Sequence, residues 1–553
     1  MFAGPIIARE VLTAPRPLRF YVARAAYAGL LFILMWTAWQ SLVGWREVRE
    51  VGVLARFGSL LFAGFSLLQL TLMLFFAPLA AATAVAHEKD RRTFLLLLMT
   101  DLSDLEIVAG KLTASLLQIG TLLATAAPVS FLCLLLGGVS PEQVVDVLAV
   151  TAAAGLAGGA LGLVVALWRD RTFQSLALTV LLVVLALVIA EVAAALVPMA
   201  QVGGIPLATA LNPYRAVLEA IEPATSTVSG HSVAPLAFVV VALVVAAALV
   251  VFGVVRLRVW NPGKNEPREQ REGDDAEELT EVIDPATPIE ADSLGLHVPR
   301  RTHRRRIRKA RPYRKPWSNP ILWRELRTRA YGRKPLIIKG AYVLAFALGV
   351  ALYQYALGLD PNPWRGAKAL IPAALAILSL ILINAQGVTS LTSERDTGAL
   401  DLLLVTELSP REFIYGKLYG VLYNAKEMVV LPLALMVGFA VTGLMGIESA
   451  VFAIIDFLLL AHFAAMLGLH AAITYTNSRA AVAHSLGTIF FLMIGILICA
   501  WLIILSDREF GRQLISFTIF IGAGSVALYG SLGAKNPSQA IALVALLTPF
   551  WTF

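Results

Sequence analysis

Charged side chains are scarce in this chain of 553 residues. They make up 15% of the sequence, whereas hydrophobic residues make up 58%, and the mean hydropathy is +0.76. Soluble globular proteins average about 25% charged residues, so the composition excludes that class. The uncharged runs are long enough to cross a bilayer as helices, each of which needs about 20 apolar residues. We therefore expect an all-α polytopic membrane protein.

Cysteine is nearly absent, since only Cys133 and Cys499 occur, each inside an apolar run. Two isolated cysteines support neither a disulfide framework nor a metal site.

A phosphate-binding loop is also missing. Gly110-Lys111 and Gly416-Lys417 are each followed by leucine, and both lack the earlier glycine and the hydroxyl residue of that loop. We therefore expect no ATP hydrolysis, no cofactor and no metal in this chain, and we do not expect it to be an enzyme.

One stretch of the chain occurs twice. Glu88–Leu112 reads EKDRRTFLLLLMTDLSDLEIVAGKL, and Glu394–Leu418 reads ERDTGALDLLLVTELSPREFIYGKL. The two copies align without a gap at an offset of 306 (394 − 88), called here the repeat offset, and 12 of the 25 positions are identical. A match of this length in one register indicates an internal repeat.

Each copy has the pattern of a short surface helix, a turn and a longer helix. The apolar core of each copy has six residues, which is too few to span a bilayer. Ser103 and Glu106 have the spacing of a capping box, as do Ser409 and Glu412, and Pro410 suits the first helical position. We predict a second helix that starts after each serine and runs through the Gly-Lys pair into the next apolar segment.

A second motif occurs near the start of each half of the chain. Gly4–Glu10 reads GPIIARE and Asn319–Glu325 reads NPILWRE, at an offset of 315 (319 − 4). Each copy precedes an apolar run, which predicts a short helix lying at the cytoplasmic interface. The polar end of this helix is formed by Arg9 and Glu10 in the first copy, and by Arg324 and Glu325 in the second. The alternative is a plain positively charged flank.

Six apolar segments precede a charged linker and six follow it. They are 25–44, 59–86, 112–137, 147–168, 173–199 and 233–255, and then 337–357, 369–391, 428–446, 450–475, 481–505 and 513–532. The segment 513–532 has no counterpart in the first half. The second half is therefore either closed by this segment or lacks its last helix. The arginine-rich N-terminus is expected on the cytoplasmic side.

The linker covers residues 261–316 and divides the chain into a first transmembrane unit, 1–260, and a second, 317–553. It holds 11 Asp or Glu between Glu266 and Asp292, and 10 Arg or Lys between Arg300 and Lys315. Neither part can bury a core, so we expect disorder. We expect the basic part to contact anionic lipid headgroups. Cytoplasmic loops and this linker explain the net charge of +8 better than nucleic-acid binding does.

The repeated stretch, with Glu-x-Asp, Leu-Leu-Leu-x-Thr-x-Leu-Ser-x-x-Glu and Gly-Lys-Leu, resembles the coupling helix of permease subunits of type 2 ATP-binding-cassette (ABC) transporters. The Asn319–Glu325 motif is similar to the elbow helix of that family. The resemblance covers roughly residues 1–257 and 319–505. It implies two tandem units of about six membrane helices, each with an N-terminal interfacial helix and a cytoplasmic coupling helix between helices 2 and 3.

The resemblance also implies a function. The chain would be the permease of an exporter in the plasma (bacterial inner) membrane, coupled to two copies of a separate cytoplasmic ATPase that binds ATP and Mg²⁺. The coupling positions would be Glu88, Asp90, Thr100, Ser103, Glu106, Gly110 and Lys111, and Glu394, Asp396, Thr406, Ser409, Glu412, Gly416 and Lys417. Arg91-Arg92 stand where the second copy has Thr397-Gly398, and the family favours glycine there, so the first copy is expected to couple more weakly. Alternatively, the charged members only flank helices at the interface.

Ionisable residues inside apolar segments are candidates for a transport pathway, because such groups are costly in a bilayer. Asp456, His462 and His470 fall in 450–475, and Glu191 falls in 173–199. The two histidines are eight positions apart and lie roughly on one helix face. The alternative is hydrogen bonding within the bundle or, for Glu191, a place near the outer surface.

Two other functions remain open on the sequence. One is a secondary transporter built from repeats, which typically has broken helices and charges at the bilayer midplane. The other is a membrane scaffold that holds cytoplasmic partners through the linker. Neither needs paired coupling elements, so an ATPase that copurifies with the chain would separate these readings from the permease.

Overall fold

The computed structural model describes residues 18–44, 51–90, 93–169, 172–197, 201–202, 205–222, 233–261, 319–327, 335–359, 362, 370–396, 398–505, 510–533, 535 and 537–552. These residues form a helical bundle, with one short antiparallel pair of β1 (Gln201–Val202) and β2 (Ile205–Pro206). Nine helices in this part of the chain are long and apolar enough to cross a membrane, or ten if one bent pair counts as a single span. The expected all-α multi-pass membrane protein is confirmed for the described residues.

The helices before the linker, here called the N-terminal half, include one along each predicted apolar segment, whereas two short helices fall between the segments 173–199 and 233–255. The helices of this half are α2 (Leu18–Leu42), α3 (Val51–Asp90), α4 (Phe94–Leu98), α5 (Asp104–Leu136), α6 (Pro141–Trp168), α7 (Thr172–Leu196), α8 (Leu207–Leu211), α9 (Pro213–Ile221) and α10 (Val233–Trp260). Helix α5 begins directly after Ser103 and continues without interruption, as predicted. The first interfacial motif, at residues 4–10, lies outside the described residues.

The helices after the linker, here called the C-terminal half, repeat much of this order. They are α12 (Pro320–Arg327), α13 (Pro335–Leu359), α14 (Leu370–Asp396), α15 (Ala399–Leu404), α16 (Pro410–Asn424), α17 (Lys426–Val441), α18 (Ile447–Thr474), α19 (Ser478–Leu505), α20 (Phe510–Gly533) and α21 (Gln539–Thr552). Apart from Asn261, the linker 261–316 lies outside the described residues, so its expected disorder stays a prediction.

One predicted helix is broken. The helix that starts at Pro410 was expected to run on into 428–446, but α16 and α17 meet at an angle of 61°. The break lies at Ala425, where the backbone leaves the helical conformation. At the start of α17, Glu427 forms an ion pair of 3.0 Å with Lys339 of α13. This contact holds α17 against the bundle while α16 diverges from it.

Helix boundaries recur at the repeat offset. Helix α6 begins at Pro141 and ends at Trp168, and α18 begins and ends at the positions related to these by the same offset (447 − 141 and 474 − 168). The offset also relates the starts of α5 and α16 (410 − 104) and the starts of α7 and α19 (478 − 172). The shared geometry therefore extends well beyond the stretch that matches in sequence. Below, the counterpart of a residue is the one related to it by the repeat offset.

The closest helix crossings also recur at this offset. A Cβ added to Gly162 of α6 would overlap the carbonyl oxygen of Pro78 in α3. At Gly468 of α18, a Cβ would lie 2.6 Å from the carbonyl oxygen of Asn384 in α14. The glycines are counterparts (468 − 162), and so are their neighbours (384 − 78). Glycine lets membrane helices approach closely, so each crossing depends on its glycine.

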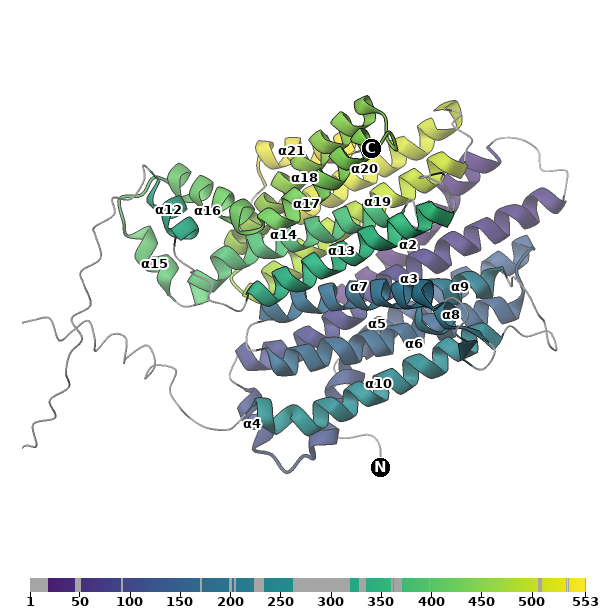
Figure 1. The fold of residues 1–553 in the computed structure, drawn as a ribbon, viewed down its shortest axis with the longest axis horizontal. Helices are drawn as coiled ribbons and strands as arrows, with labels where there is room; N and C mark the ends of the chain where they lie inside the picture. Colours follow the sequence, from purple (N-terminus) through teal and green to yellow (C-terminus); the bar gives the residue numbers. More distant parts are fainter. Residues whose placement is uncertain are drawn as a thin grey trace, which may run out of the picture.

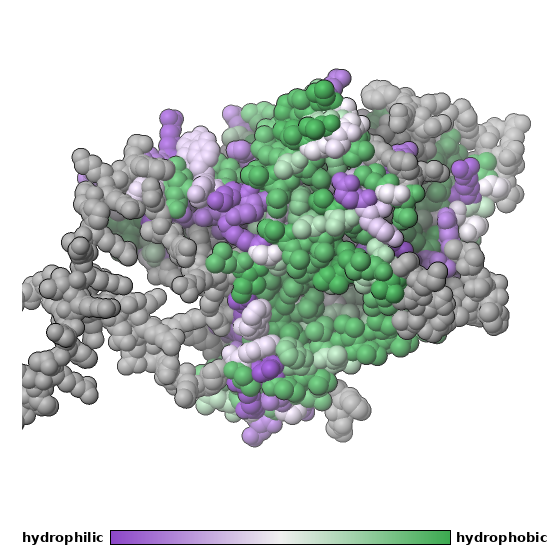
Figure 2. Space-filling model, viewed as in Figure 1, coloured by the Kyte–Doolittle hydropathy of each residue, from purple (hydrophilic) through white to green (hydrophobic). Residues whose placement is uncertain are grey.

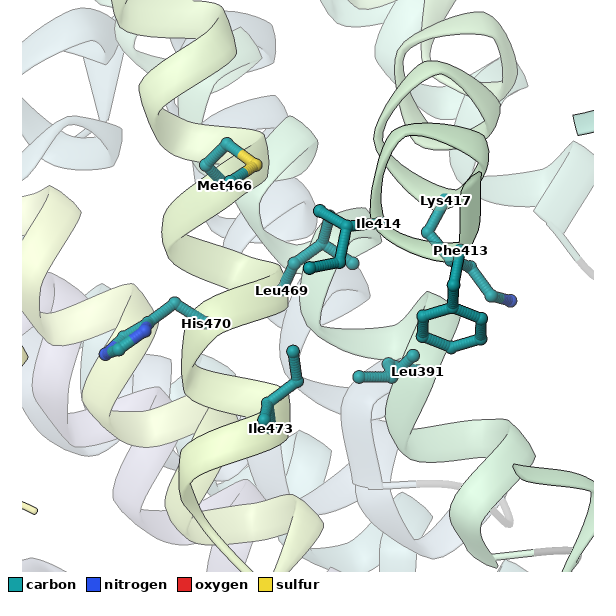
Figure 3. Close-up of a pocket in the computed structure, with 8 residues that line it drawn as sticks. All are labelled: Leu391, Phe413, Ile414, Lys417, Met466, Leu469, His470 and Ile473. Atoms are coloured by element: carbon teal, nitrogen blue, oxygen red, sulfur yellow. The ribbon is translucent and has the colours of Figure 1, made fainter. Parts of the chain in front are cut away.

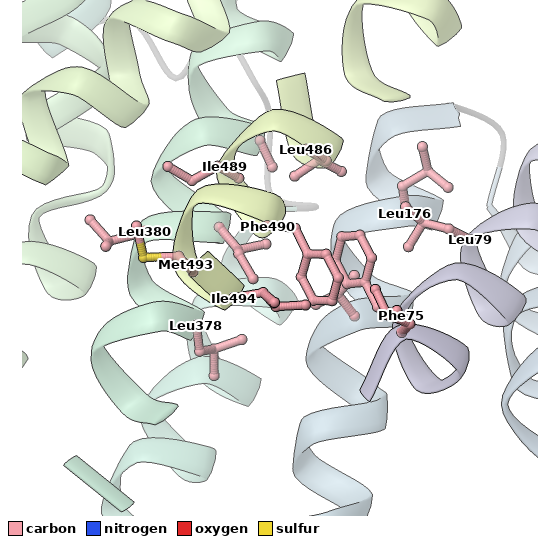
Figure 4. Packing of buried hydrophobic residues seen from close by; sticks show 14 of the residues in the cluster. Phe75, Leu79, Leu176, Leu378, Leu380, Leu486, Ile489, Phe490, Met493 and Ile494 are labelled. Carbon is pink, nitrogen blue, oxygen red and sulfur yellow. The ribbon is translucent and has the colours of Figure 1, made fainter. Parts of the chain in front are cut away.

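The two halves pack side by side along their helices (Figure 1). Helix α7 lies against α13, and α2 lies against α20. At the centre of the contact, Phe75 of α3 stacks on Phe490 of α19 with ring centroids 3.6 Å apart. Figure 4 shows these rings surrounded by leucine, isoleucine and methionine side chains from both halves. The core of the bundle is thus continuous across the two halves.

The two ends of the bundle differ from its middle. The short helices α4, α12 and α15 lie at one end, called here the α4/α15 end, and α8 and α9 lie toward the other (Figure 1). Figure 2 shows a broad apolar area over the middle of one face, with polar residues gathered to its left and right. This pattern is typical of a protein whose middle zone faces lipid.

Candidate functional site

The short helices at the α4/α15 end are fixed by capping boxes. Ser103 Oγ accepts a hydrogen bond from the Glu106 backbone N–H at 3.3 Å, and Glu106 Oε2 accepts one from the Ser103 backbone N–H at 2.9 Å. The same pair of bonds joins Ser409 and Glu412, at 3.2 and 3.0 Å. Both predicted capping boxes are confirmed, and each holds the turn that leads from the short helix into the next one.

The threonines of the repeat close the short helices. Thr100 Oγ1 donates to the Leu97 carbonyl oxygen at 2.7 Å, and Thr406 Oγ1 donates to the Leu403 carbonyl oxygen at 2.5 Å. These carbonyls lie in the last turn of a helix, and the backbone N–H of the same threonine also donates to each of them, at 3.3 and 3.2 Å. The identical threonine therefore has the same local role in both copies.

Each short helix and the turn after it expose apolar side chains. They are Leu96, Met99 and Leu105 in the first copy, and Leu402, Leu404 and Val405 in the second. Val405 is 86% exposed, and no residue of α15 is buried. Exposed acidic residues, Asp101 in the first copy and Asp401 and Glu407 in the second, lie among them. We call these two surfaces the α4 tip and the α15 tip.

In the second copy, the predicted charged residues form a buried ion cluster. Lys417 Nζ lies 2.6 Å from Glu325 Oε1 and 2.7 Å from Glu394 Oε1. Arg324 pairs with Glu394 as well, and its Nη2 lies 3.4 Å from Glu325 Oε1. The side chains of Lys417 and Glu325 are only 1% and 2% exposed. The cluster joins α12, α14 and α16, so the two separate sequence motifs meet in one site.

Helix α12 packs on α16 through glycines. A Cβ at Gly416 would lie 2.8 Å from Ile321 Cβ, and one at Gly420 would lie 2.8 Å from Glu325 Cβ. Asn319 Nδ2 donates to the Glu412 carbonyl oxygen at 2.8 Å. The glycine of the repeated Gly-Lys pair therefore makes room for α12, and the lysine that follows binds the carboxylate of α12.

In the first copy, Lys111 forms an ion pair with Glu88. Their side chains are 12% and 20% exposed. Arg9 and Glu10, which match Arg324 and Glu325 in the interfacial motif, lie outside the described residues. The structure thus brings the predicted glutamate and lysine together in both copies.

A basic residue next to each glutamate anchors the repeat to a neighbouring helix. Lys89 Nζ donates to the carbonyl oxygens of Leu167 and Arg169 at 2.5 and 3.2 Å. Arg395 Nη1 donates to those of Ala472 and Tyr475 at 2.8 and 2.6 Å. Cations are favoured at the C-terminal ends of helices, here α6 and α18.

The sequence interpretation missed Lys89 and Arg395, because the residue type differs between the copies and only the charge is shared. Of the remaining predicted positions, Asp396 accepts a hydrogen bond from Ser478 Oγ at 2.7 Å. Asp90 is the last residue of α3, and Gly110 is buried within α5.

The candidate pathway residues do not form one site. Asp456 is half-buried in α18, and His462 is exposed, with Nδ1 2.9 Å from the Leu458 carbonyl oxygen. His470 Nε2 lies 3.1 Å from the Leu532 carbonyl oxygen of α20. No hydrogen bond or ion pair joins the three in the described part of the chain, and no group of ligating side chains there could hold a metal ion. Their role in transport stays a prediction.

Glu191 lies at the end of the bundle opposite the tips. Arg215 of α9 binds it through two hydrogen bonds of 2.7 and 2.6 Å, and Asn212 Nδ2 donates to it at 2.6 Å. Tyr214 bonds Thr71 at 3.0 Å, and burial raises the pKa of the Tyr214 phenol, which keeps it neutral. These bonds attach α9 to the C-terminal part of α7 and to the middle of α3.

Comparison with protein-family models finds no match, and neither does comparison with curated proteins.

Proposed function

We propose that this chain is the membrane permease of an ATP-driven ABC transporter of type 2, with two permease units fused in one chain. The α4 and α15 tips act as coupling helices, each of which docks on one copy of a separate ATPase that binds ATP and Mg²⁺. The α4/α15 end is then cytoplasmic, the membrane is the plasma (bacterial inner) membrane, and the direction is export. The chain itself catalyses no reaction.

The observation that carries this proposal is the pair of apolar tips held in register. Exposed leucine occurs at Leu96 and at its counterpart Leu402, and an exposed apolar residue occurs likewise at Met99 and its counterpart Val405. Isolated apolar residues on a surface need no explanation, but a contiguous apolar patch marks an interaction site. Two matched patches at one end of the bundle fit two copies of one partner.

The residue types of the tips indicate what kind of partner surface would bind them. An apolar centre with acidic neighbours, such as Asp401 and Glu407, calls for an apolar cleft with a basic rim. A tip that docks there transmits motion only if it is rigidly attached. The ion cluster at Lys417 and the Glu88–Lys111 pair provide this attachment, because each joins the helix before the tip to the helix after it.

Motion of the tips then reaches the contact between the halves. The α15 tip is joined to α14 and α16, and α14 lies against α19, which carries Phe490. The α4 tip is joined to α3, which carries Phe75. When two ATPase copies close on ATP, the tips approach each other and one half rocks against the other. The stacked rings of Phe75 and Phe490 lie at the contact between the halves, so this movement would shift one ring relative to the other.

The test is purification of the chain from its native membrane in mild detergent. A subunit with a phosphate-binding loop is expected to copurify, and its amount should fall at least tenfold with Leu402→Asp and Val405→Asp combined with Leu96→Asp and Met99→Asp. All four side chains are more than 60% exposed, so the substitutions spare the core. Leu196→Asp, at a 76% exposed site at the opposite end of α7, is the matched control and should leave copurification unchanged. Absence of such an ATPase from the intact complex would overturn the proposal.

A further inference from the structure

One face of α18 is exposed although the matching face of α6 is buried. The positions are spaced by seven and therefore lie on one side of each helix. In α6, Ala153, Ala160 and Leu167 are 5%, 0% and 2% exposed, whereas their counterparts in α18, Leu459, Met466 and Ile473, are 47%, 41% and 60% exposed. The two halves thus differ in what covers this face.

In the N-terminal half, α10 covers it. A Cβ at Gly253 of α10 would lie 3.5 Å from the side chains of Leu167 and Val164, and 3.6 Å from that of Val108. Further along α10, Ala242 and Ala246 are also buried, so small residues occupy the contact face between the buried Phe238 and Leu257. Such a face is typical of helices that pack closely in a membrane.

In the C-terminal half, a pocket lies where Gly253 would sit. The counterparts of Val108, Val164 and Leu167 are Ile414, His470 and Ile473, and all three line one pocket of about 160 Å³ between α14, α16 and α18. Figure 3 shows its apolar walls, with the ammonium group of Lys417 directed away from them.

The same face carries the half-buried carboxylate of Asp456, one oxygen of which, Oδ1, lacks a hydrogen-bond partner among the described residues. The counterpart of Asp456 in α6 is Val150, which is fully buried at 0% exposure. An ionisable group within a membrane helix is costly and usually meets a polar partner. A lipid chain could fill the apolar pocket, but it would leave Asp456 unpaired, whereas a helix can fill the pocket and supply a donor.

We propose that this face of α18, formed by Asp456, Leu459, Met466 and Ile473 with the adjoining pocket, binds a transmembrane helix of a partner subunit. The partner helix takes the place that α10 takes in the N-terminal half. It presents a small residue to the pocket and a hydrogen-bond donor at the level of Asp456. The proposal rests on helix packing and is independent of the proposed ATPase.

The test is photo-crosslinking in the native membrane. The photoreactive residue p-benzoylphenylalanine replaces Met466, and the control carries it at Val251, which is 60% exposed on α10. The expected product at Met466 is an adduct with a discrete polypeptide, mapped to an apolar segment of about 20 residues. At Val251, no such adduct is expected. Adducts with lipid only, or with a second copy of this chain, would overturn the proposal.

Substitutions at two further positions test whether the crosslink depends on this face of α18. Leu459→Trp places a large ring in the exposed face and should reduce the Met466 adduct at least tenfold. Asp456→Leu should also reduce it about tenfold, whereas Asp456→Asn, which keeps an acceptor oxygen, should preserve most of it. All three variants should keep the wild-type melting temperature, since each site is exposed or lacks a partner among the described residues. Adduct yields unaffected by Leu459→Trp and Asp456→Leu would show that the partner does not bind this face.

Discussion

Lys417 connects three helices through two carboxylates. Glu325 comes from α12, Glu394 comes from α14, and the lysine itself lies in α16. Charges removed from water are stable only when their partners are well placed, so a buried cluster of this kind depends on all its members. The side chain also donates to the Ser390 carbonyl oxygen at 3.2 Å, which adds α14 backbone to the same site.

Replacing Lys417 by methionine should strongly destabilise the protein, because the buried carboxylates of Glu325 and Glu394 would then have to share the guanidinium of Arg324. Breaking a buried pair typically costs about 3–5 kcal/mol. Lys111→Met is the matched variant and should cost less, since Lys111 and Glu88 are more exposed to solvent. Melting temperatures in detergent measure both effects. Equal losses in the two variants would contradict the assignment of Lys417 as the more deeply buried link.

The crossing glycines give a second residue-scale prediction. Gly162→Ala and Gly468→Ala force backbone apart at the α3–α6 and α14–α18 crossings and should each cost about 1–3 kcal/mol. Gly120→Ala and Gly487→Ala are the controls, because a Cβ there meets nothing within 4 Å. These controls should stabilise their helices by about 0.5–1 kcal/mol. Loss of stability in the controls as large as at the crossings would refute the packing explanation.

The sequence predicted some of these residues better than others. The charged and capping positions could be predicted, because identical residues at one offset are visible without a structure. The apolar tip residues were not singled out, since exposed leucine and buried leucine look alike in sequence. The contact between Glu325 and Lys417 could not be predicted either, because it joins residues 92 positions apart (417 − 325) in different motifs.

At the scale of elements, the capping boxes decide how firmly each tip is held. Ser409 starts α16 and fixes the turn that follows α15. A third capping box joins Ser140 and Gln143 at the start of α6, at the opposite end of the bundle. The same chemistry therefore occurs both at a proposed docking site and away from it.

Ser409→Ala should cost about 1 kcal/mol and speed hydrogen exchange in the first turn of α16, because the Glu412 backbone N–H loses its acceptor. It should also reduce stimulation of the partner ATPase severalfold. Ser140→Ala should cost a similar free energy but leave ATPase stimulation unchanged. If both variants lower stimulation equally, the effect reflects stability alone and the tip has no special role.

The helix starts after Ser103 and Ser409 were predictable, because capping residues are local signals, whereas α2 and α3 begin several residues before the predicted apolar segments 25–44 and 59–86. The break between α16 and α17 was not predicted, because Lys426 and Glu427 can equally lie within a helix that continues from Pro410. The ion pair between Glu427 and Lys339 is a tertiary contact at the start of α17 that the sequence does not reveal. The packing of α12 on α16 likewise depends on glycines whose neighbours the sequence does not reveal.

For the whole molecule, the two halves share a framework but differ at its edge. The repeat offset relates helix ends, glycine crossings, capping boxes and ion pairs in both halves. The halves differ where α10 covers α6, since the corresponding face of α18 is exposed. A framework that recurs in both halves, with one open face, is consistent with the two proposed coupling tips and the one additional proposed binding surface.

The most direct test of the account is the stoichiometry of the native complex. Native mass spectrometry of the purified complex should show two ATPase copies for each copy of this chain, because each tip docks one. Leu402→Asp with Val405→Asp should reduce the ratio to one, through loss of the α15 tip alone. A complex with one ATPase per wild-type chain, or with none, would contradict the claim that this chain carries two coupling helices.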